Sequence, residues 1–141
     1  MPGTRPSKLE ALKHIPLFAG LGRRELATVA RISHELEFEA GEELIRQDKP
    51  GRWFFVLLDG EADVRRDGVE INRLGPGDFF GEISLLSDRP TTASVETVTS
   101  GYAAVIAPRD FRRLLQEMPL LQMKVIQALA ARLPDEFYLE G

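Results

Sequence analysis

The sequence predicts a mainly antiparallel β-domain, built as a sandwich or barrel, with helices at both ends. Turn residues recur at short, regular intervals from about residue 35 to residue 107, with strand-like runs between them. Outside this stretch, apolar residues recur at the three- and four-residue spacing of amphipathic helices. A chain of 141 residues has room for one domain with a substantial core, so we expect a single domain over residues 1–141.

The helical N-terminus is expected over residues 1–34. Residues 8–13 suit one or two helical turns, which Pro16 brings to an end. A second helix is expected to begin near Gly22. Its inner face follows the i, i+3, i+4, i+7 spacing and comprises Leu26, Val29, Ala30 and Ser33.

The strands are expected over residues 35–107. The segment WFFVLL at 53–58 predicts a buried strand. ADVRR and VEINRL flank Asp67-Gly68, and a two-residue Asp-Gly loop predicts a hairpin because both central residues need positive φ. The last strands are predicted in TASVETV and YAAVIA, before the chain reaches Pro108.

Two helices are expected over residues 108–134, separated at Pro119. The first has one apolar face, formed by Phe111, Leu114, Leu115 and Met118. The second has two apolar stripes, one of Met118, Leu121, Val125 and Ala128 and the other of Leu120, Met123, Ile126, Ala130 and Leu133. Two stripes fit either a helix buried on both sides or a helix that covers the sheet and also forms a dimer contact or a lid.

Charge and composition exclude several classes of function. A net charge of −4 at pH 7 argues against a nucleic-acid-binding surface, so no nucleic-acid partner is expected for this chain alone. The absence of cysteine excludes disulfides and thiolate metal sites. No apolar run reaches the roughly 18 residues that cross a bilayer, and the first residues lack the apolar core of a signal peptide. We therefore expect a cytoplasmic protein without membrane contact.

The pattern of potential catalytic residues gives no sign of an enzyme. A metal-dependent β-barrel enzyme needs two or three histidines and a carboxylate on its strands, whereas His14 and His34 lie in or beside the helical N-terminus. A serine nucleophile would lack a neighbouring histidine for the same reason. Acids such as Glu61 and Asp63 alternate along a strand, which is typical of its solvated face. We expect no catalytic residue, metal or cofactor.

The segment FGEISLLSDRPTTASV, at 80–95, combines features that could hold a phosphate and a sugar. Gly81 lets the backbone approach a ligand closely, and a short helix at 82–87 would point its first amides at an anion. An ionised Glu82 accepts hydrogen bonds from hydroxyls such as those of a ribose. The alternative is an ordinary loop between strands, with a solvated glutamate and threonines that favour extended backbone.

Three segments, EAGEELIRQD, FFVLLDGEADV and RLGPGDFFGEISLL, favour the first alternative because their order and spacing match a known family. With 80–95 they closely resemble the cyclic nucleotide-binding domains of catabolite-activator-type regulators, cyclic-AMP-dependent kinase regulatory subunits and cyclic-nucleotide-gated channels. Residues 80–95 resemble the phosphate-binding cassette of that family. The resemblance implies an eight-stranded antiparallel β-roll, jelly-roll-like, with an N-terminal helix and two C-terminal helices.

The resemblance also implies a role for each residue of the cassette. Glu82 is expected to hold the ribose 2′-hydroxyl, and Thr92 to touch phosphate or purine. The full set of residues implied in cyclic-nucleotide binding is Gly81, Glu82, Ile83, Ser84, Arg89, Thr91, Thr92 and Ala93. The implied ligand is cAMP or cGMP, and the implied function is that of a regulatory sensor. Its partner would be an effector protein or a fused domain, and a homodimer through the C-terminal helix is a further expectation.

The cassette departs from the family at one position. Ligand-binding members carry an arginine just before the residue that matches Thr92, and this sequence has Thr91 there. Loss of that contact would cost roughly 2–4 kcal/mol, or about 30- to 1000-fold in affinity. Three hypotheses follow: Arg89 takes over the role, the pocket binds weakly or prefers another ligand, or the roll binds no nucleotide and serves as a protein-interaction module. No DNA-binding module fits after residue 133, so the chain is expected to act in trans or within a larger protein.

Overall fold

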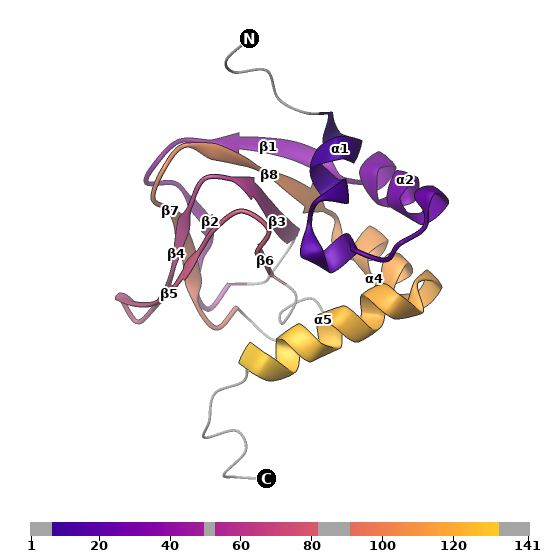
Figure 1. Ribbon diagram of the computed structural model, residues 1–141. Helices are drawn as coiled ribbons and strands as arrows, with labels where there is room; N and C mark the ends of the chain where they lie inside the picture. Colours follow the sequence, from indigo (N-terminus) through magenta and orange to yellow (C-terminus); the bar gives the residue numbers. More distant parts are fainter. Residues whose placement is uncertain (1–6, 50–52, 82–90, 133–141) are drawn as a thin grey trace, which may run out of the picture.

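The computed structural model describes residues 7–49, 53–81 and 91–132 (Figure 1). Its helices are α1 (Lys8–Lys13), the 3₁₀ helix η1 (Pro16–Phe18), α2 (Arg23–Ile32), α4 (Pro108–Glu117) and α5 (Pro119–Arg132). Its strands are β1 (His34–Phe38), β2 (Glu43–Ile45), β3 (Phe54–Asp59), β4 (Ala62–Arg66), β5 (Val69–Leu74), β6 (Phe79–Phe80), β7 (Ser94–Thr97) and β8 (Gly101–Ile106). The predicted order, with helices before and after the strands, is confirmed.

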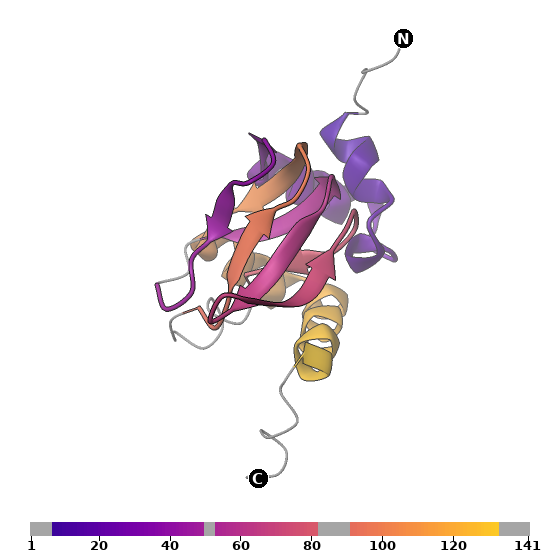
Figure 2. The ribbon, with the colours of Figure 1, turned by 90° about the vertical axis from the view of Figure 1, so that its left-hand side faces the viewer.

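The described strands form two four-stranded sheets with the orders β1-β8-β3-β6 and β2-β7-β4-β5. Every hydrogen-bonded pair of strands in them is antiparallel. In Figure 2 the second sheet faces the viewer, while the helices lie behind or beside it. The predicted eight-stranded antiparallel β-roll with flanking helices is therefore confirmed.

Helix α1 spans the predicted residues 8–13, and α2 begins directly after Gly22, as predicted, whereas Pro16 starts the 3₁₀ helix η1. Gly22 is the N-cap of α2, and its amide donates to Glu25 Oε1 at 2.9 Å, which satisfies one of the free donors at the start of the helix. Helix α1 begins after Ser7, whose Oγ accepts from the amide of Glu10 at 3.2 Å. Local hydrogen bonds of this kind explain why the sequence alone locates these ends.

The hairpin predicted at Asp67-Gly68 is confirmed. Both residues have positive φ, +53° and +82°, and they join β4 to β5 with Arg66 paired to Val69. The strand predicted at 53–58 is confirmed from Phe54 onward, but the prediction of burial is wrong for Trp53, which is 40% exposed. Trp53 precedes the first residue of β3 that pairs with β8, so it lies outside the sheet.

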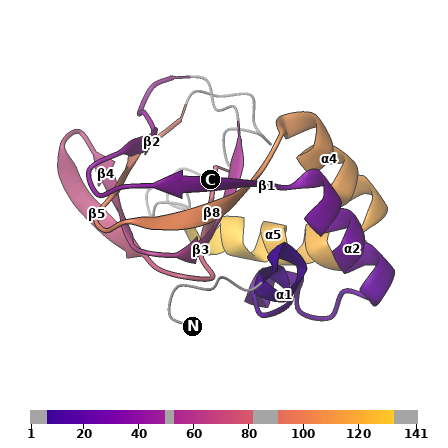
Figure 3. The same ribbon diagram turned by 90° about the horizontal axis from the view of Figure 1, so that it is seen from above.

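The core has two parts. One lies inside the roll, where the rings of Phe55 and Phe80 stack at 4.8 Å. The other lies between the roll and the helices, where Phe54 of β3 stacks on Phe111 of α4 at 4.2 Å. Figure 3 shows α1, α2 and α4 gathered at one end of the roll, with α5 running from them along the sheets. The helices therefore pack against one end of the roll, and the core part that contains Phe54 and Phe111 lies between them and the strands.

Helix α5 has the two different faces that its sequence predicts. Met118, Leu121 and Val125 are buried, whereas Leu120, Met123 and Ile126 are 42%, 58% and 55% exposed. The middle of the helix is tied to the N-terminal segment, because Lys124 Nζ donates to the carbonyls of Pro16, at 3.0 Å, and Ala19, at 2.5 Å. An outward apolar stripe is what a dimer contact or a lid needs. The predicted homodimer through this helix stays a prediction.

Within the described residues, no helix is both long enough and apolar enough to cross a membrane.

Candidate functional site

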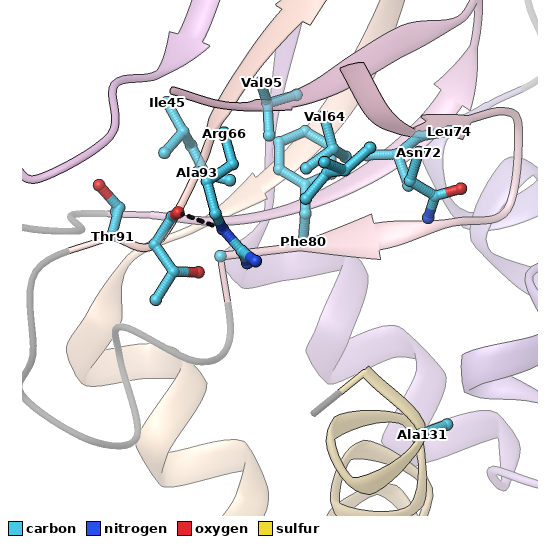
Figure 4. A pocket seen from close by; sticks show the side chains of 13 residues that line it. Ile45, Val64, Arg66, Asn72, Leu74, Phe80, Thr91, Ala93, Val95 and Ala131 are labelled. Carbon is cyan, nitrogen blue, oxygen red and sulfur yellow. Dashed lines mark hydrogen bonds between the residues drawn. The ribbon is translucent and has the colours of Figure 1, made fainter. Parts of the chain in front are cut away.

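A cavity of about 330 Å³ opens between the second sheet and α5 (Figure 4). Its walls are mostly apolar and come from β2, β4, β5, β6 and β7, and they meet Ala131 in the last turn of α5. The wall residues are Ile45, Val64, Ile71, Leu74, Phe80 and Val95. Apolar walls with a few polar groups at the rim suit a small ligand that has a flat, apolar part.

Gly81 stands at the rim, where the chain leaves β6. Its φ is +98°, and a Cβ atom built on it would lie 2.5 Å from the carbonyl oxygen of Trp53. Such a position accepts glycine alone, because the backbone conformation and the available space both exclude a side chain. The tight approach of the chain here is consistent with the predicted role of Gly81. The roles predicted for Glu82, Ile83, Ser84 and Arg89 concern positions outside the described residues and stay predictions.

Thr91 is buried, and its hydroxyl faces the protein. The Oγ1 atom bonds the carbonyl of Arg46 and lies 3.1 Å from the carbonyl of Lys49. It also accepts from the amide of Lys49 at 3.3 Å, while the Thr91 amide donates to the Lys49 carbonyl at 3.0 Å. Thr91 thus fastens the residues that lead into β7 to the turn at 46–49, and it brings no positive charge to the cavity.

Thr92 and Ala93 follow on the same rim and line the same cavity. Thr92 is exposed, and its carbonyl accepts a hydrogen bond from the side chain of Arg66 at 3.1 Å. The structure therefore gathers Gly81, Thr91, Thr92 and Ala93 around one cavity, although nine residues of the sequence lie between Gly81 and Thr91. What each of them binds stays a prediction.

A family model described as the cyclic nucleotide-binding domain matches residues 35–118, more than half of the chain. This match covers the β-roll, the described rim of the cavity and α4. The chain belongs to the cyclic nucleotide-binding domain family.

Individual relatives of this cyclic nucleotide-binding domain include regulatory subunits of kinases. The cAMP-dependent protein kinase regulatory subunit of Emericella nidulans is 38% identical over 106 residues, which are 74% of this chain and 26% of that protein. The chain thus spans about a quarter of the length of this curated relative.

Two solved structures share the fold of the domain. The cAMP-bound structure of PfPKA-R (141-441) matches with a TM-score of 0.76 at 27% identity, over 82% of this chain and 40% of that one. The regulatory subunit of a cAMP-independent protein kinase A from Trypanosoma cruzi, bound to guanosine, matches with a TM-score of 0.74 at 26% identity, over 82% of this chain and 42% of that one. The fungal protein and the Trypanosoma cruzi protein are both named as regulatory subunits.

Sequence reasoning missed Arg66, which lines the cavity of the domain from β4. Among the described lining residues it alone carries a charge. Figure 4 shows its side chain descending from the strand past Ala93 toward the rim. Its position could have been found from the alternation of side chains along a strand, because Ala62 and Val64 of the same face point into the roll.

Asp63 of β4 and Glu61, just before this strand, form an ion-pair cluster with arginines of β4 and β5. Asp63 is 6% exposed, so the prediction of a solvated face is wrong for this residue. Its carboxylate accepts from Arg73 Nε at 2.5 Å and from Arg65 Nη2 at 3.3 Å, and Arg73 Nη1 also pairs with Glu61 at 3.0 Å. Hydrogen bonds to Asp63 and Glu61 raise the pKa of the Arg73 guanidinium, which is charged at any ordinary pH. Partnering by two arginines explains how this carboxylate tolerates burial.

Among the described residues, no group of three or more His, Cys, Asp or Glu residues is placed to hold a metal ion. Both histidines lie at the exposed surface, and His14 Nε2 is 3.6 Å from Glu10 Oε1.

Replacing Thr91 with valine is expected to lower the free energy of unfolding by about 1–3 kcal/mol, because the buried partners of its hydroxyl lose their hydrogen bonds. Urea denaturation followed by circular dichroism measures the change. Thr92→Val is the matched control, since Thr92 is exposed and the expected change is within about 0.5 kcal/mol. Equal midpoints for wild type and Thr91→Val would show that the hydroxyl does not stabilise this turn.

Proposed function

We propose that this domain is a regulatory sensor whose cavity binds a cyclic nucleotide, cAMP or cGMP. The observation that carries the proposal is the cavity itself, in which both described ends of the cassette, Gly81 and 91–93, meet an apolar chamber. In a cyclic nucleotide-binding domain, such a cavity supports ligand binding rather than catalysis. The cAMP in the name of the fungal relative and in the PfPKA-R structure favours cAMP as the first ligand to test.

The proposed contacts divide the ligand into three parts. The purine lies against apolar walls such as Val64, Phe80 and Val95. This contact is favourable because it removes apolar surface from water. The ribose 2′-hydroxyl bonds Glu82, and the cyclic phosphate lies against the backbone amides of the cassette, including those of Gly81 and Ala93. An affinity lower than that of members with the cassette arginine is expected if these amides act alone, because amides carry no net charge.

A second candidate is a nucleoside, which has the same base and sugar but no phosphate. Two observations favour it. Thr91 replaces the expected positive charge with a hydroxyl that is already bonded to the turn at 46–49. In addition, the regulatory subunit from Trypanosoma cruzi is bound to guanosine. The third hypothesis, a roll that binds protein and no nucleotide, predicts that neither class of compound binds.

The proposed output of the sensor is helix α5. Ala131 in its last turn borders the cavity, while Leu121 and Val125 of the same helix lie in the core between roll and helices. A ligand in the cavity therefore touches an element that also presents an exposed apolar stripe. We propose that this stripe passes the signal to an effector protein or a fused domain, and we keep the cytoplasmic location predicted above.

Isothermal titration calorimetry with cAMP, cGMP and guanosine tests these alternatives. We expect saturable heat with at least one cyclic nucleotide, and about 10- to 100-fold weaker binding for Glu82→Gln, because a hydrogen bond to a charged acceptor is lost. Glu117→Gln on α4 is the control, since this exposed residue pairs with Arg113 and does not line the cavity. Heat with guanosine alone would favour the second candidate, and no heat from any compound at millimolar concentration would exclude both.

A further inference from the structure

We propose that Arg66, on strand β4, pairs with the phosphate of the ligand and so fills the role that Thr91 leaves open in the cassette. This inference rests on the proposed function, because it assumes that the ligand carries a phosphate. It differs from the hypothesis that Arg89 takes over, since the charge comes from another strand of the roll. It also assigns a ligand-binding role to a residue outside the segment 80–95.

The first support is the position of the side chain. Arg66 is the last residue of β4, and its Nε donates to the carbonyl of Thr92 at 3.1 Å, which fixes the guanidinium beside the cassette (Figure 4). No described residue forms a hydrogen bond with its two terminal nitrogens, Nη1 and Nη2. This leaves the end of the guanidinium, a planar pair of donors, for two oxygens of one phosphate.

The second support is charge. The other arginines of this hairpin are already paired, because Arg65 and Arg73 share the carboxylate of Asp63 and Arg73 also pairs with Glu61. Arg66 has no carboxylate within 4.0 Å among the described residues. In a chain of net charge −4, the cavity thus contains one positive side chain in its described lining, which favours an anionic ligand.

The third support is a hydrogen-bonded frame that holds Arg66 and Thr91 together. The tip of the hairpin is joined to the turn at 46–49 by two bonds of 2.8 Å, from Gln47 Nε2 to Asp67 Oδ1 and from the Asp67 amide to Gln47 Oε1. Thr91 binds the same turn through its hydroxyl. Thr91 therefore anchors the rim, and Arg66, next to the anchored hairpin tip, supplies the charge.

A purely structural role for Arg66 would be to bond the Thr92 carbonyl and nothing else. The two roles differ in what they predict for ligands with and without phosphate. A phosphate partner affects cyclic nucleotides only, and its contribution falls with ionic strength because salt screens the attraction. A structural residue affects all ligands of the cavity alike.

Calorimetry of wild type, Arg66→Gln and Arg66→Lys with cAMP, cGMP, adenosine and guanosine distinguishes them. We expect Arg66→Gln to weaken binding of the cyclic nucleotides at least tenfold and to change nucleoside binding by less than twofold. Arg66→Lys is expected to lie in between, because it keeps the charge and loses the paired donors. Raising KCl from 50 to 500 mM should weaken cyclic-nucleotide binding more in wild type than in Arg66→Gln. Arg113→Gln, which changes the net charge equally at an exposed residue of α4 outside the cavity lining, should match wild type.

Each other outcome has a definite meaning. Unchanged cAMP and cGMP affinity in Arg66→Gln, with binding by wild type, would overturn this inference and leave the proposed function standing. An equal loss for nucleosides and cyclic nucleotides, or equal salt dependence in wild type and Arg66→Gln, would assign Arg66 a structural role and overturn it as well. Absence of cyclic-nucleotide binding by wild type would overturn the proposed function and this inference with it. Thermal unfolding of each variant shows whether a loss of binding comes from loss of the fold, and Arg66→Lys decides the question if Arg66→Gln unfolds.

Discussion

Gly81→Ala is expected to destabilise the domain by roughly 2–4 kcal/mol and to abolish binding in the cavity. Backbone strain and a steric clash combine. The φ of +98° is unfavourable for alanine, and the new Cβ would lie 2.5 Å from the carbonyl oxygen of Trp53. The obstacle is backbone rather than the flexible end of a side chain, so relief requires β3 or the start of the cassette to move. Either movement displaces the rim of the cavity.

The control for this variant is available in the same chain. Gly68 has a φ of +82° and nothing within 4 Å of a built Cβ, so Gly68→Ala tests the backbone conformation alone and should cost about 1–2 kcal/mol. Gly75 has neither a positive φ nor a close neighbour, and Gly75→Ala should change stability by less than about 0.5 kcal/mol. Urea denaturation and cAMP calorimetry of all three variants give the comparison. A Gly81→Ala midpoint no lower than that of Gly68→Ala would show that the close approach to Trp53 contributes nothing.

Phe111→Ala is expected to cost about 3–5 kcal/mol, the range for removing a fully buried aromatic ring. Phe111 is 1% exposed on α4, and its ring stacks on Phe54 of β3 at 4.2 Å with an interplanar angle of 14°. Phe54 in turn lies 5.6 Å from the ring of Phe79, which immediately precedes the cavity residue Phe80. The loss should therefore loosen the attachment of the C-terminal helices to the sheet that leads to the cavity.

The measurement is again the midpoint of urea denaturation. Gln116→Ala, on the exposed side of the same helix, should stay within about 0.5 kcal/mol of wild type. Phe111→Leu should lose less than Phe111→Ala, because it leaves a smaller cavity. Equal stability of Phe111→Ala and Gln116→Ala would contradict the assignment of Phe111 to the core between roll and helices.

Features with local causes could be predicted from the sequence. The hairpin at Asp67-Gly68 follows from two adjacent residues that accept positive φ, and the start of α2 follows from the glycine and glutamate that cap it. The two faces of α5 follow from the helical period, although the period alone could not decide whether the second stripe is covered. The order of strands and helices was likewise readable from turn residues and changes of period.

The sequence predicted a segment whose described ends border the cavity, but not how its side chains are arranged. The ligand-binding role of 80–95 and the departure at Thr91 stay predictions. The sequence could not show where the Thr91 hydroxyl points, because its partners lie 42 to 45 residues earlier in the chain. Arg66 was missed because a strand arginine next to a hairpin is usually exposed. Alternation along β4 puts it on the inward face with Ala62 and Val64, but the sequence does not show that the cavity reaches the end of this strand.

The attachment of α5 has a mechanical consequence. The two carbonyls that hold Lys124 fix the middle of the helix, whereas Ala131, seven residues further on, borders the cavity. At about 1.5 Å per residue, these two points are roughly 10 Å apart along the axis. The helix is thus held at Lys124, while its last turn lies at the cavity. A ligand that displaces the last turn would tilt α5 about Lys124 rather than shift it along its axis. A spectroscopic label on the exposed side of α5 should therefore report an occupied cavity as a change in the angle between α5 and the roll.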